Sequence, residues 1–327
     1  MAVNIFNIPV KTTINRSMNS KSIMVVGKSK SGKSTIASQA PRPIFLMTEN
    51  GGEALTGFTP VPIGSWSDFK QVVSQLCTEQ ARGQFDTVVI DTYTNLILLL
   101  DKYVGSKLST EKNSLDFGSE ADFGKGAKAM RNELGIQLQK LANQGYLLLN
   151  IVHAEDKVDF ATGKEYIGTS LSNSLYGVAE KFVDQIIYLR RDVNKAGEVK
   201  HTIWFNEKGG FKGAGGRFTP QIDYCDCSYK ALEGAILGAI DSTGVSTIET
   251  NKPSVQIEVD DYDFEGLMEA FKSYTTQLMA QDTSNGTKIT KIVESVLGAG
   301  KKVNSMTSNQ GELLNEINNK LKTEFGL

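Results

Sequence analysis

The sequence VVGKSKSGKST at residues 25–35 decides which fold this chain can adopt. Residues 27–34 satisfy the pattern G-x-x-x-x-G-K-[ST] of a phosphate-binding loop. The apolar residues 23–26 predict a buried strand before the loop, and residues 34–39 have the composition of a helix start after it. Strand, loop and helix in this order are the context in which the pattern binds a nucleoside triphosphate.

The chemistry of phosphate binding explains the residue types of this loop. Glycines let the backbone curl until its N–H groups face phosphate oxygens, and the N-terminus of the following helix adds positive potential. We expect Lys33 to reach the β- and γ-phosphates of ATP and the Ser34 hydroxyl to ligate Mg²⁺. The predicted nucleotide-binding residues are Gly27, Lys28, Ser29, Lys30, Ser31, Gly32, Lys33, Ser34 and Thr35.

Short apolar runs follow the loop at residues 43–47, 87–90, 146–152 and 185–189, with helical patterns between several of them. Fully apolar strands that alternate with helices indicate a mostly parallel sheet covered on both faces. The sequence therefore predicts an α/β core. At 327 residues the chain exceeds an average domain, so a smaller second part is expected beside this core.

Two carboxylates follow predicted strands. Asp91 follows the run 87–90 at the sheet edge where ligands of open α/β sheets bind, and we expect it to hold Mg²⁺ through water, from the side opposite Ser34. Many enzymes with this loop place a glutamate directly after that aspartate, but here Thr92 follows. Glu49, just after the run 43–47, is therefore the candidate for orienting or deprotonating the attacking water. The alternative for Glu49 is a solvated loop acid.

Several of these segments together resemble a known family. The phosphate-binding loop is followed by Thr48-Glu49-Asn50, by the sequence TVVIDT at residues 87–92, and by a strand that ends at His153. This order is similar to the RecA-type core, and over residues 21–224 it most resembles the bacteriophage nucleotide-binding proteins of the Sak recombinase group. The members of that group are short RecA-like ATPases that anneal single strands of DNA.

The resemblance implies roles for further residues. Glu49 matches the catalytic glutamate of RecA-like proteins, which acts with Lys33, and His153 matches the polar residue that senses the γ-phosphate. RecA-like assemblies complete each ATP site with basic residues from a neighbouring subunit. In the glycine-rich segment 208–217 the candidates for this role are Lys212 and Arg217. A glycine-rich hairpin with exposed basic residues is the alternative reading of that segment.

The resemblance also implies DNA-binding loops at two polar stretches, residues 104–128 and 154–174, which we predict to be long loops. Lysines that neutralise phosphates and aromatics that stack on bases suit single-stranded DNA. A solvated loop whose lysines balance neighbouring acidic residues is the alternative. The candidate DNA contacts are Lys107, Lys112, Lys125 and Lys128.

The predicted organisation is an ATPase core at residues 1–240, an acidic and polar linker at 241–263, and a small helical domain at 264–327. Helical spacing of apolar residues is found at 264–281, 288–297 and 310–325. A formal net charge of -2 excludes a uniformly basic coat for nucleic acid. No apolar run approaches the roughly 20 residues of a membrane span, and no secretory signal is recognisable, so we expect a cytoplasmic protein, in the host cytoplasm if a phage encodes it.

These features favour an ATPase that assembles on single-stranded DNA and pairs complementary strands during recombination or replication. It would associate with itself in a filament or ring, and a single-strand DNA-binding protein is a further expected partner. The alternative from another class is a helicase loader or similar adaptor, in which ATP switches a protein contact made by the C-terminal helices. A small-molecule kinase is disfavoured because no separate arginine-rich lid segment is recognisable.

Overall fold

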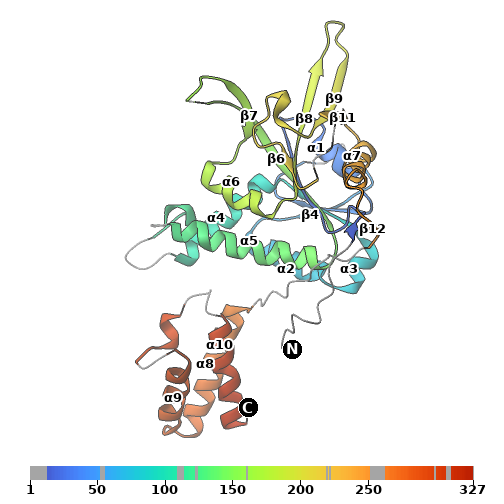
Figure 1. Ribbon diagram of the computed structural model, residues 1–327. Helices are drawn as coiled ribbons and strands as arrows, with labels where there is room; N and C mark the ends of the chain where they lie inside the picture. Colours follow the sequence, from blue (N-terminus) through green and yellow to red (C-terminus); the bar gives the residue numbers. More distant parts are fainter. Residues whose placement is uncertain are drawn as a thin grey trace. The chain divides into compact units, whose positions relative to one another are not determined.

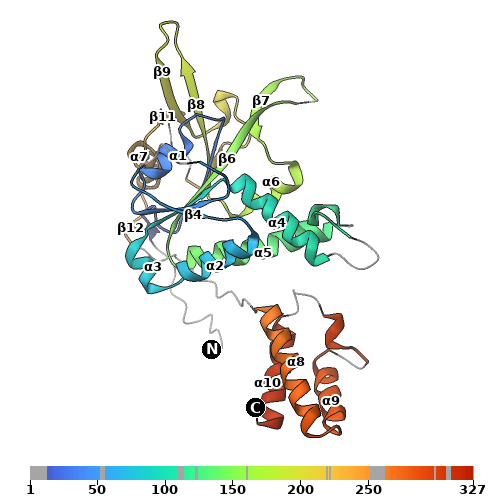
Figure 2. The same ribbon diagram turned by 180° about the vertical axis from the view of Figure 1, so that it is seen from behind.

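The computed structural model describes residues 13–51, 56–108, 114–121, 124–159, 161–218, 220, 222–250, 262–297, 300–306 and 311–326. The chain divides into two units, Met1–Ile257 and Glu258–Leu327. Figures 1 and 2 show the ribbon from opposite sides. The first unit carries the sheet and the phosphate-binding loop, and the second is helical.

The strands of the first unit are β1 (Ile14–Asn15), β2 (Ser22–Gly27), β3 (Pro43–Met47), β4 (Thr59–Pro62), β5 (Thr87–Asp91), β6 (Leu147–Val158), β7 (Glu165–Thr169), β8 (Gln185–Val193), β9 (Val199–Trp204), β10 (Gly215–Gly216), β11 (Tyr224–Asp226) and β12 (Thr247–Ile248). Its α-helices are α1 (Lys33–Ser38), α2 (Trp66–Leu76), α3 (Glu79–Gln84), α4 (Tyr93–Leu108), α5 (Lys125–Asn143), α6 (Asn173–Ala179) and α7 (Tyr229–Asp241). Short 3₁₀ turns are η2 (Gly118–Glu120), η4 (Glu180–Phe182) and η5 (Glu207–Gly209).

The main sheet has the order β11-β9-β8-β2-β6-β5-β3-β4, with β10 added to β8 and β7 added to β6. The strands from β8 to β4 in this order run parallel, whereas β9, β10, β11 and β7 pair antiparallel with their neighbours. The expected α/β core with a mostly parallel sheet is therefore confirmed. One strand, β6, separates the strand before the phosphate-binding loop from the strand that ends at Asp91.

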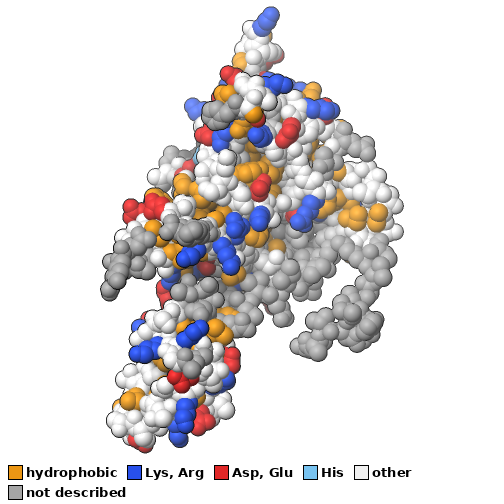
Figure 3. Space-filling model, turned by 60° about the vertical axis from the view of Figure 1, so that its left-hand side comes forward, with side chains coloured by type: hydrophobic (Ala, Val, Ile, Leu, Met, Phe, Trp, Pro, Cys, Tyr) orange, Lys and Arg blue, Asp and Glu red, His pale blue; other side chains and the backbone are white. Residues whose placement is uncertain are grey.

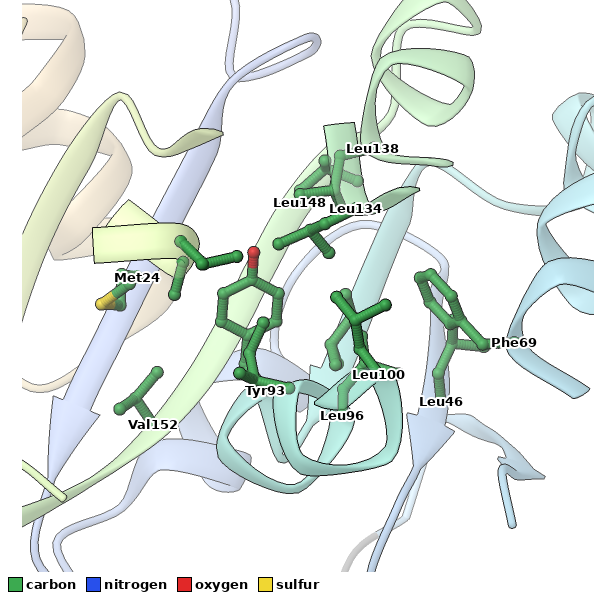
Figure 4. Close-up of a cluster of buried hydrophobic side chains, with 14 of the residues drawn as sticks. Met24, Leu46, Phe69, Tyr93, Leu96, Leu100, Leu134, Leu138, Leu148 and Val152 are labelled. Carbon is green, nitrogen blue, oxygen red and sulfur yellow. The ribbon is translucent and has the colours of Figure 1, made fainter. Parts of the chain in front are cut away.

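Both faces of the sheet are buried, which explains the fully apolar strands. Along β2, Met24 and Val26 pack with α2, α4, α5 and α6 on one face, while Ile23 and Val25 pack with α1 and α7 on the other. Tyr93, at the start of α4, lies at the centre of the first of these clusters (Figure 4). A strand with a helical layer on each face has no solvent side, so polar residues are excluded from it.

Sequence patterns located the central strands but missed the peripheral ones. The predicted runs correspond to β2, β3, β5, β6 and β8, whereas β4, β7, β9 and β11 were not foreseen. These strands lie at or beyond the margins of the parallel sheet, where one face or edge is exposed and a continuous apolar run is not required. β4 even contains Pro60 and Pro62, which only an edge strand accommodates.

The two stretches predicted to be long loops are partly regular structure, and both predictions are corrected. In the stretch 104–128, α4 extends to Leu108 and α5 begins at Lys125, so Lys107, Lys125 and Lys128 are helical residues; Lys112 lies outside the described residues. In the stretch 154–174, β6 continues to Val158 and pairs antiparallel with β7. The side chains of this hairpin are largely exposed and mixed in charge, so it lacks the apolar run of a buried strand.

The stretch predicted to be a linker, residues 241–263, contains β12, which pairs in parallel with β1. Arg16, next to β1, donates hydrogen bonds to both carboxylate oxygens of Asp241 at 2.7 and 3.0 Å. Residues 241–250 are thus part of the first unit, whereas 251–261 lie outside the described residues. Turn-forming composition alone does not reveal such pairing.

The second unit consists of α8 (Phe264–Gln281), α9 (Asn285–Leu297), α10 (Gly311–Phe325) and the 3₁₀ turn η6 (Val303–Ser305). It has its own core, formed by apolar residues of all four elements: Leu278, Ile289, Val293, Val303, Leu314, Ile317 and Leu321. The expected small helical part is confirmed. Within the ranges that the structure describes, no helix combines the length and apolar character that a membrane span requires.

Two buried tyrosines in the core of the first unit allow a matched test of hydrogen bonding. The Tyr93 hydroxyl is buried and has no hydrogen-bond partner among the described residues, whereas the Tyr146 hydroxyl donates to the Leu76 carbonyl oxygen at 2.8 Å. We expect Tyr93→Phe to leave the free energy of unfolding unchanged or raise it by up to about 1 kcal/mol, and Tyr146→Phe to lower it by about 1 kcal/mol. Urea unfolding of both variants measures this; a clear loss of stability in Tyr93→Phe would contradict the unpaired hydroxyl.

Candidate nucleotide-binding site

The carboxyl ends of four parallel strands meet at one edge of the sheet. Gly27 at the end of β2 is level with His153 on β6, and Met47 at the end of β3 is level with Asp91 on β5. Parallel register therefore brings the phosphate-binding loop, Glu49, Asp91 and His153 to the same edge, although Gly27 and His153 are 126 positions apart in the sequence.

The phosphate-binding loop depends on both of its glycines. A Cβ at Gly27 would lie 2.3 Å from the Ser31 hydroxyl oxygen, so any side chain there would force Ser31 to move within the loop. Gly32 caps α1 with φ of 97° and ψ of 14°, a left-handed conformation that other residues rarely adopt. The loop is thereby bent tightly enough to present its backbone at the start of α1.

Lys33 is buried inside its own loop. Its ammonium group donates hydrogen bonds to the carbonyl oxygens of Gly27 at 2.8 Å and Lys28 at 2.9 Å. Burial lowers the pKa of Lys33, and the nearby carboxylates of Asp91 and Glu49 oppose part of this effect. A phosphate group entering the loop would supply the charge-assisted partner that two neutral carbonyls cannot.

Ser34 and Asp91 form the pair expected to hold Mg²⁺. The Ser34 hydroxyl donates to Asp91 Oδ2 at 2.7 Å, and burial raises the pKa of Asp91 above its ordinary value. The two side-chain oxygens are therefore in direct contact at the end of β5. A hydroxyl and a carboxylate oxygen this close suit neighbouring positions in the coordination shell of Mg²⁺, whose adjacent oxygen ligands are about 3 Å apart.

Glu49 and His153 are in contact at the same edge. His153 Nε2 lies 3.3 Å from Glu49 Oε2, and both side chains are about one third exposed, each at 36%. Asn95 Nδ2 also donates to Glu49 Oε2, at 3.1 Å. A carboxylate fixed by two neighbours and still open to solvent is suited to orienting a water molecule.

Helix α4 connects these residues, and sequence reasoning missed its contribution. In its first turn, Asn95 binds Glu49 and the Thr94 hydroxyl oxygen accepts the His153 backbone N–H at 3.2 Å. Just before the helix, the Thr92 N–H donates to the Thr48 hydroxyl oxygen at 2.9 Å, and the Asp91–Thr92 peptide bond is cis. The available signal was positional: polar residues directly after Asp91 stand where a helix begins at the ligand edge.

A second feature that the sequence did not reveal is a link from the loop to the β6–β7 hairpin. Lys28 Nζ lies 2.6 Å from Asp156 Oδ2 on β6. Beside the loop is a cavity of about 510 Å³, lined by Lys28, Ser29 and Ser31 of the loop and by residues of β8 and the η5 region that include Arg190, Arg191 and Phe211. The cavity gives a ligand held by the loop room on the β8 side.

The candidates for action in a neighbouring subunit lie apart from each other. Lys212 Nζ lies 3.8 Å from Asp159 and 4.8 Å from the centre of the Tyr166 ring, beside the β6–β7 hairpin. Arg217 lies 3.1 Å from Asp184, which precedes β8 at the amino end of the parallel strands. The glycine-rich segment thus does not gather its basic residues into one cluster, and neither of them is paired with Asp91 or Glu49 of its own chain.

The candidate DNA contacts are likewise divided. Lys107 lies near the end of α4, 5.4 Å from the centre of the Tyr103 ring, while Lys125 and Lys128 are exposed on the first turns of α5. On the second unit, Figure 3 shows Lys and Arg side chains interspersed with Asp and Glu. The face in view therefore carries no continuous basic surface on that unit.

The chain is similar to proteins of a known family. The family described as AAA domain, AAA_24, matches residues 19–217, which is more than half of the chain. The SPbeta prophage-derived uncharacterized protein YorG of Bacillus subtilis is 26% identical over 339 residues, covering 98% of this chain and 98% of that protein. A solved structure of a KaiC-like protein from Pyrococcus horikoshii is 15% identical with a TM-score of 0.34, covering 57% of this chain and 79% of that one.

The substitution Asp91→Asn tests what the buried carboxylate costs in stability. Because its pKa is raised in the folded state, the folded protein binds this proton more tightly than the unfolded chain, so the charged form lowers the free energy of unfolding. This loss grows as the pH rises from about 4 through the raised pKa. Without nucleotide, we expect Asp91→Asn to unfold at a higher temperature than the wild type at pH 7, with a smaller difference near pH 4, by differential scanning fluorimetry.

Asp86→Asn is the matched control, because the Arg42 guanidinium lowers the pKa of Asp86 and its charge therefore stabilises the fold. This variant should unfold at a lower temperature at pH 7. An Asp91→Asn variant that behaves like Asp86→Asn would contradict the cost assigned to Asp91.

Proposed function

This chain belongs to the AAA domain family AAA_24, and from that premise we propose that it is a Mg²⁺-dependent ATPase in which Glu49 activates the attacking water. The observation that carries the proposal is the meeting of Glu49 with Asn95 and His153 at the sheet edge where Lys33, Ser34 and Asp91 also lie. A phosphate-binding loop, metal-binding oxygens and a carboxylate open to solvent are the parts that hydrolysis of a triphosphate needs.

In this proposal, separate residues bind the phosphates, hold Mg²⁺ and activate the water. The backbone of residues 27–35 and the Lys33 ammonium hold the phosphates, with Lys33 leaving the carbonyls of Gly27 and Lys28. Ser34 and Asp91 hold Mg²⁺, which when bound neutralises charge on the phosphate oxygens. Glu49 orients the water and accepts its proton, and Asn95 keeps the carboxylate in place. His153, in contact with Glu49, is positioned to register whether the γ-phosphate is present.

We propose that this ATPase binds single-stranded DNA and acts in a phage-type annealing or recombination process. Support comes from the similarity to a prophage-derived protein, from the resemblance to RecA-like annealing proteins, and from the exposed Lys125 and Lys128 at the start of α5. Lysines contact phosphates without reading sequence, which is what an annealing protein requires. Self-association into a filament or ring, with Lys212 or Arg217 reaching a neighbouring site, belongs to the same proposal.

A helicase loader or other ATP-switched adaptor is the second candidate. It is favoured by the separate core of the second unit, whose buried cluster is formed by residues of α8, α9, η6 and α10. Such a unit can serve as a protein-binding module while the ATPase unit switches its availability. The two candidates differ in whether DNA alone, without a partner protein, stimulates hydrolysis.

The first prediction from this proposal concerns DNA dependence. We expect ATP turnover by the purified protein to rise when single-stranded DNA is added, and the rise to fade between low and high salt because counterions compete for the phosphates. The measurement is steady-state release of inorganic phosphate with and without a homopolymer DNA. An ATP turnover rate that DNA leaves unchanged at every salt concentration would favour the adaptor candidate.

The second concerns the attacking water. Glu49→Gln keeps the size of the side chain but cannot accept a proton, so we expect ATP binding to persist while kcat falls by at least about 100-fold. Glu155→Gln, an exposed carboxylate on β6 whose nearest cation is Lys157 at 3.1 Å, is the control and should retain turnover. If Glu49→Gln turns over ATP at the wild-type rate, Glu49 is not the catalytic carboxylate.

A further inference from the structure

The antiparallel side of the sheet holds the phosphate-binding loop through one histidine. His201 lies on β9, level with Arg191 of β8, and its Nδ1 is 2.9 Å from the Ser31 carbonyl oxygen in the middle of the loop. Ser31 is buried, with 2% of its surface exposed, and His201 is half-buried, so water competes little for this contact. The resemblance and the motif assign nothing to His201.

The chemistry of this contact is settled by the acceptor. A carbonyl oxygen can only accept a hydrogen bond, so Nδ1 of His201 must carry the proton and donate it. The same peptide unit that contains the Ser31 carbonyl contains the Gly32 N–H. In a planar trans peptide these two groups point in opposite directions. Holding the Ser31 oxygen toward β9 therefore turns the Gly32 N–H away from β9.

A second observation places β9 and β11 against the same peptide. A Cβ added to Gly32 would lie 3.5 Å from Cys227 Sγ and 3.6 Å from His201 Nδ1. The Cys227 N–H in turn donates to the His201 carbonyl oxygen at 3.2 Å, which ties the end of β11 to β9. Gly32 caps α1 in a left-handed conformation that other residues rarely adopt. The Ser31–Gly32 peptide therefore has an unusual backbone conformation and packs against His201 and Cys227.

We infer that His201 is a positioning residue for ATP: it fixes the Ser31–Gly32 peptide so that the Gly32 N–H faces the phosphates. The inference rests on the proposed nucleotide binding and adds to it the element that preorganises the loop. Preorganised donors gain affinity because the loop does not have to be ordered when the ligand arrives. His201 does not touch the reacting atoms, so its removal should weaken nucleotide binding more than it slows the chemical step.

Three side chains of similar shape separate hydrogen bonding from packing at this position. His201→Asn retains an N–H group two bonds from Cβ, where the histidine has Nδ1, whereas His201→Leu places a methyl group there. Lys200→Ala is the control, because Lys200 is the exposed neighbour on the same strand and its nearest ring is Tyr224, 5.9 Å from its ammonium. Dissociation constants for a non-hydrolysable ATP analogue with Mg²⁺, KM and kcat for ATP, and thermal unfolding without nucleotide are measured for all four proteins.

The expected result is a rise of roughly 5-fold in the dissociation constant and KM for His201→Leu, with kcat changed by less than about 2-fold. His201→Asn and Lys200→Ala should stay close to the wild type. Wild-type affinity in His201→Leu, or equal losses in the Asn and Leu variants, would overturn the role of the N–H group while leaving the ATPase proposal intact. A wild-type protein that does not bind the analogue would overturn both.

Discussion

Two charges of opposite sign are buried at the edge of the sheet, and the arrangement of the ATPase unit follows from their placement. Lys33 is 8% exposed and Asp91 is 5% exposed, and burial moves the pKa of each in the direction that disfavours its charge. Each finds partial compensation: Lys33 in two carbonyls of its loop, and Asp91 in the Ser34 hydroxyl. A site of this kind is less stable without its ligand than a neutral one would be. Burial of the two charges lowers the free energy of unfolding of the ligand-free protein. A phosphate and a divalent cation that paired with both charges would remove this penalty, and the gain would add to the free energy of binding.

The position of β6 determines which further groups can reach that ligand. Because β6 lies between β2 and β5, His153, where its parallel pairing with β2 ends, stands between the phosphate-binding loop and Asp91. Helix α4 begins directly after Asp91, so its first turn can bind the backbone of His153 and the side chain of Glu49 at once. A single turn of helix thus links the ends of β3, β5 and β6. If Glu49 or His153 moved on nucleotide binding, their contacts with Asn95 and Thr94 at the start of α4 would change. Lys107 lies near the other end of this helix.

How much the sequence could predict depended on burial. The central strands, Lys33, Ser34, Asp91, Glu49 and His153 could be placed at one edge because fully covered strands must be apolar and parallel strands end together. The β6–β7 hairpin and β9 escaped prediction because exposed strands tolerate polar residues such as Lys157, Lys200 and His201. Contacts made by single side chains across the fold, such as Asn95 with Glu49, leave no local pattern. The separation of Lys212 from Arg217 is of the same kind, since it depends on where the glycine-rich segment crosses β8.

The parts of the sheet that escaped prediction, the β6–β7 hairpin and β9, contact the phosphate-binding loop from two sides, and the two contacts differ in strength. On the β6 side, Lys28 and Asp156 are 51% and 70% exposed, so their ion pair contributes at most about 1 kcal/mol and is weakened further by salt. On the β9 side, His201 binds the carbonyl oxygen of the buried Ser31. Loss of this hydrogen bond would leave the Ser31 oxygen without that partner. In the proposed ATP complex the first contact could therefore be exchanged for a phosphate at little cost, because the phosphate would compete with Asp156 for Lys28. The second contact involves no atom of Lys28 and does not depend on that exchange. If a bound nucleotide displaces Asp156 from Lys28, the β6–β7 hairpin loses a contact with the phosphate-binding loop. The contact with His201 would still hold the loop in its conformation.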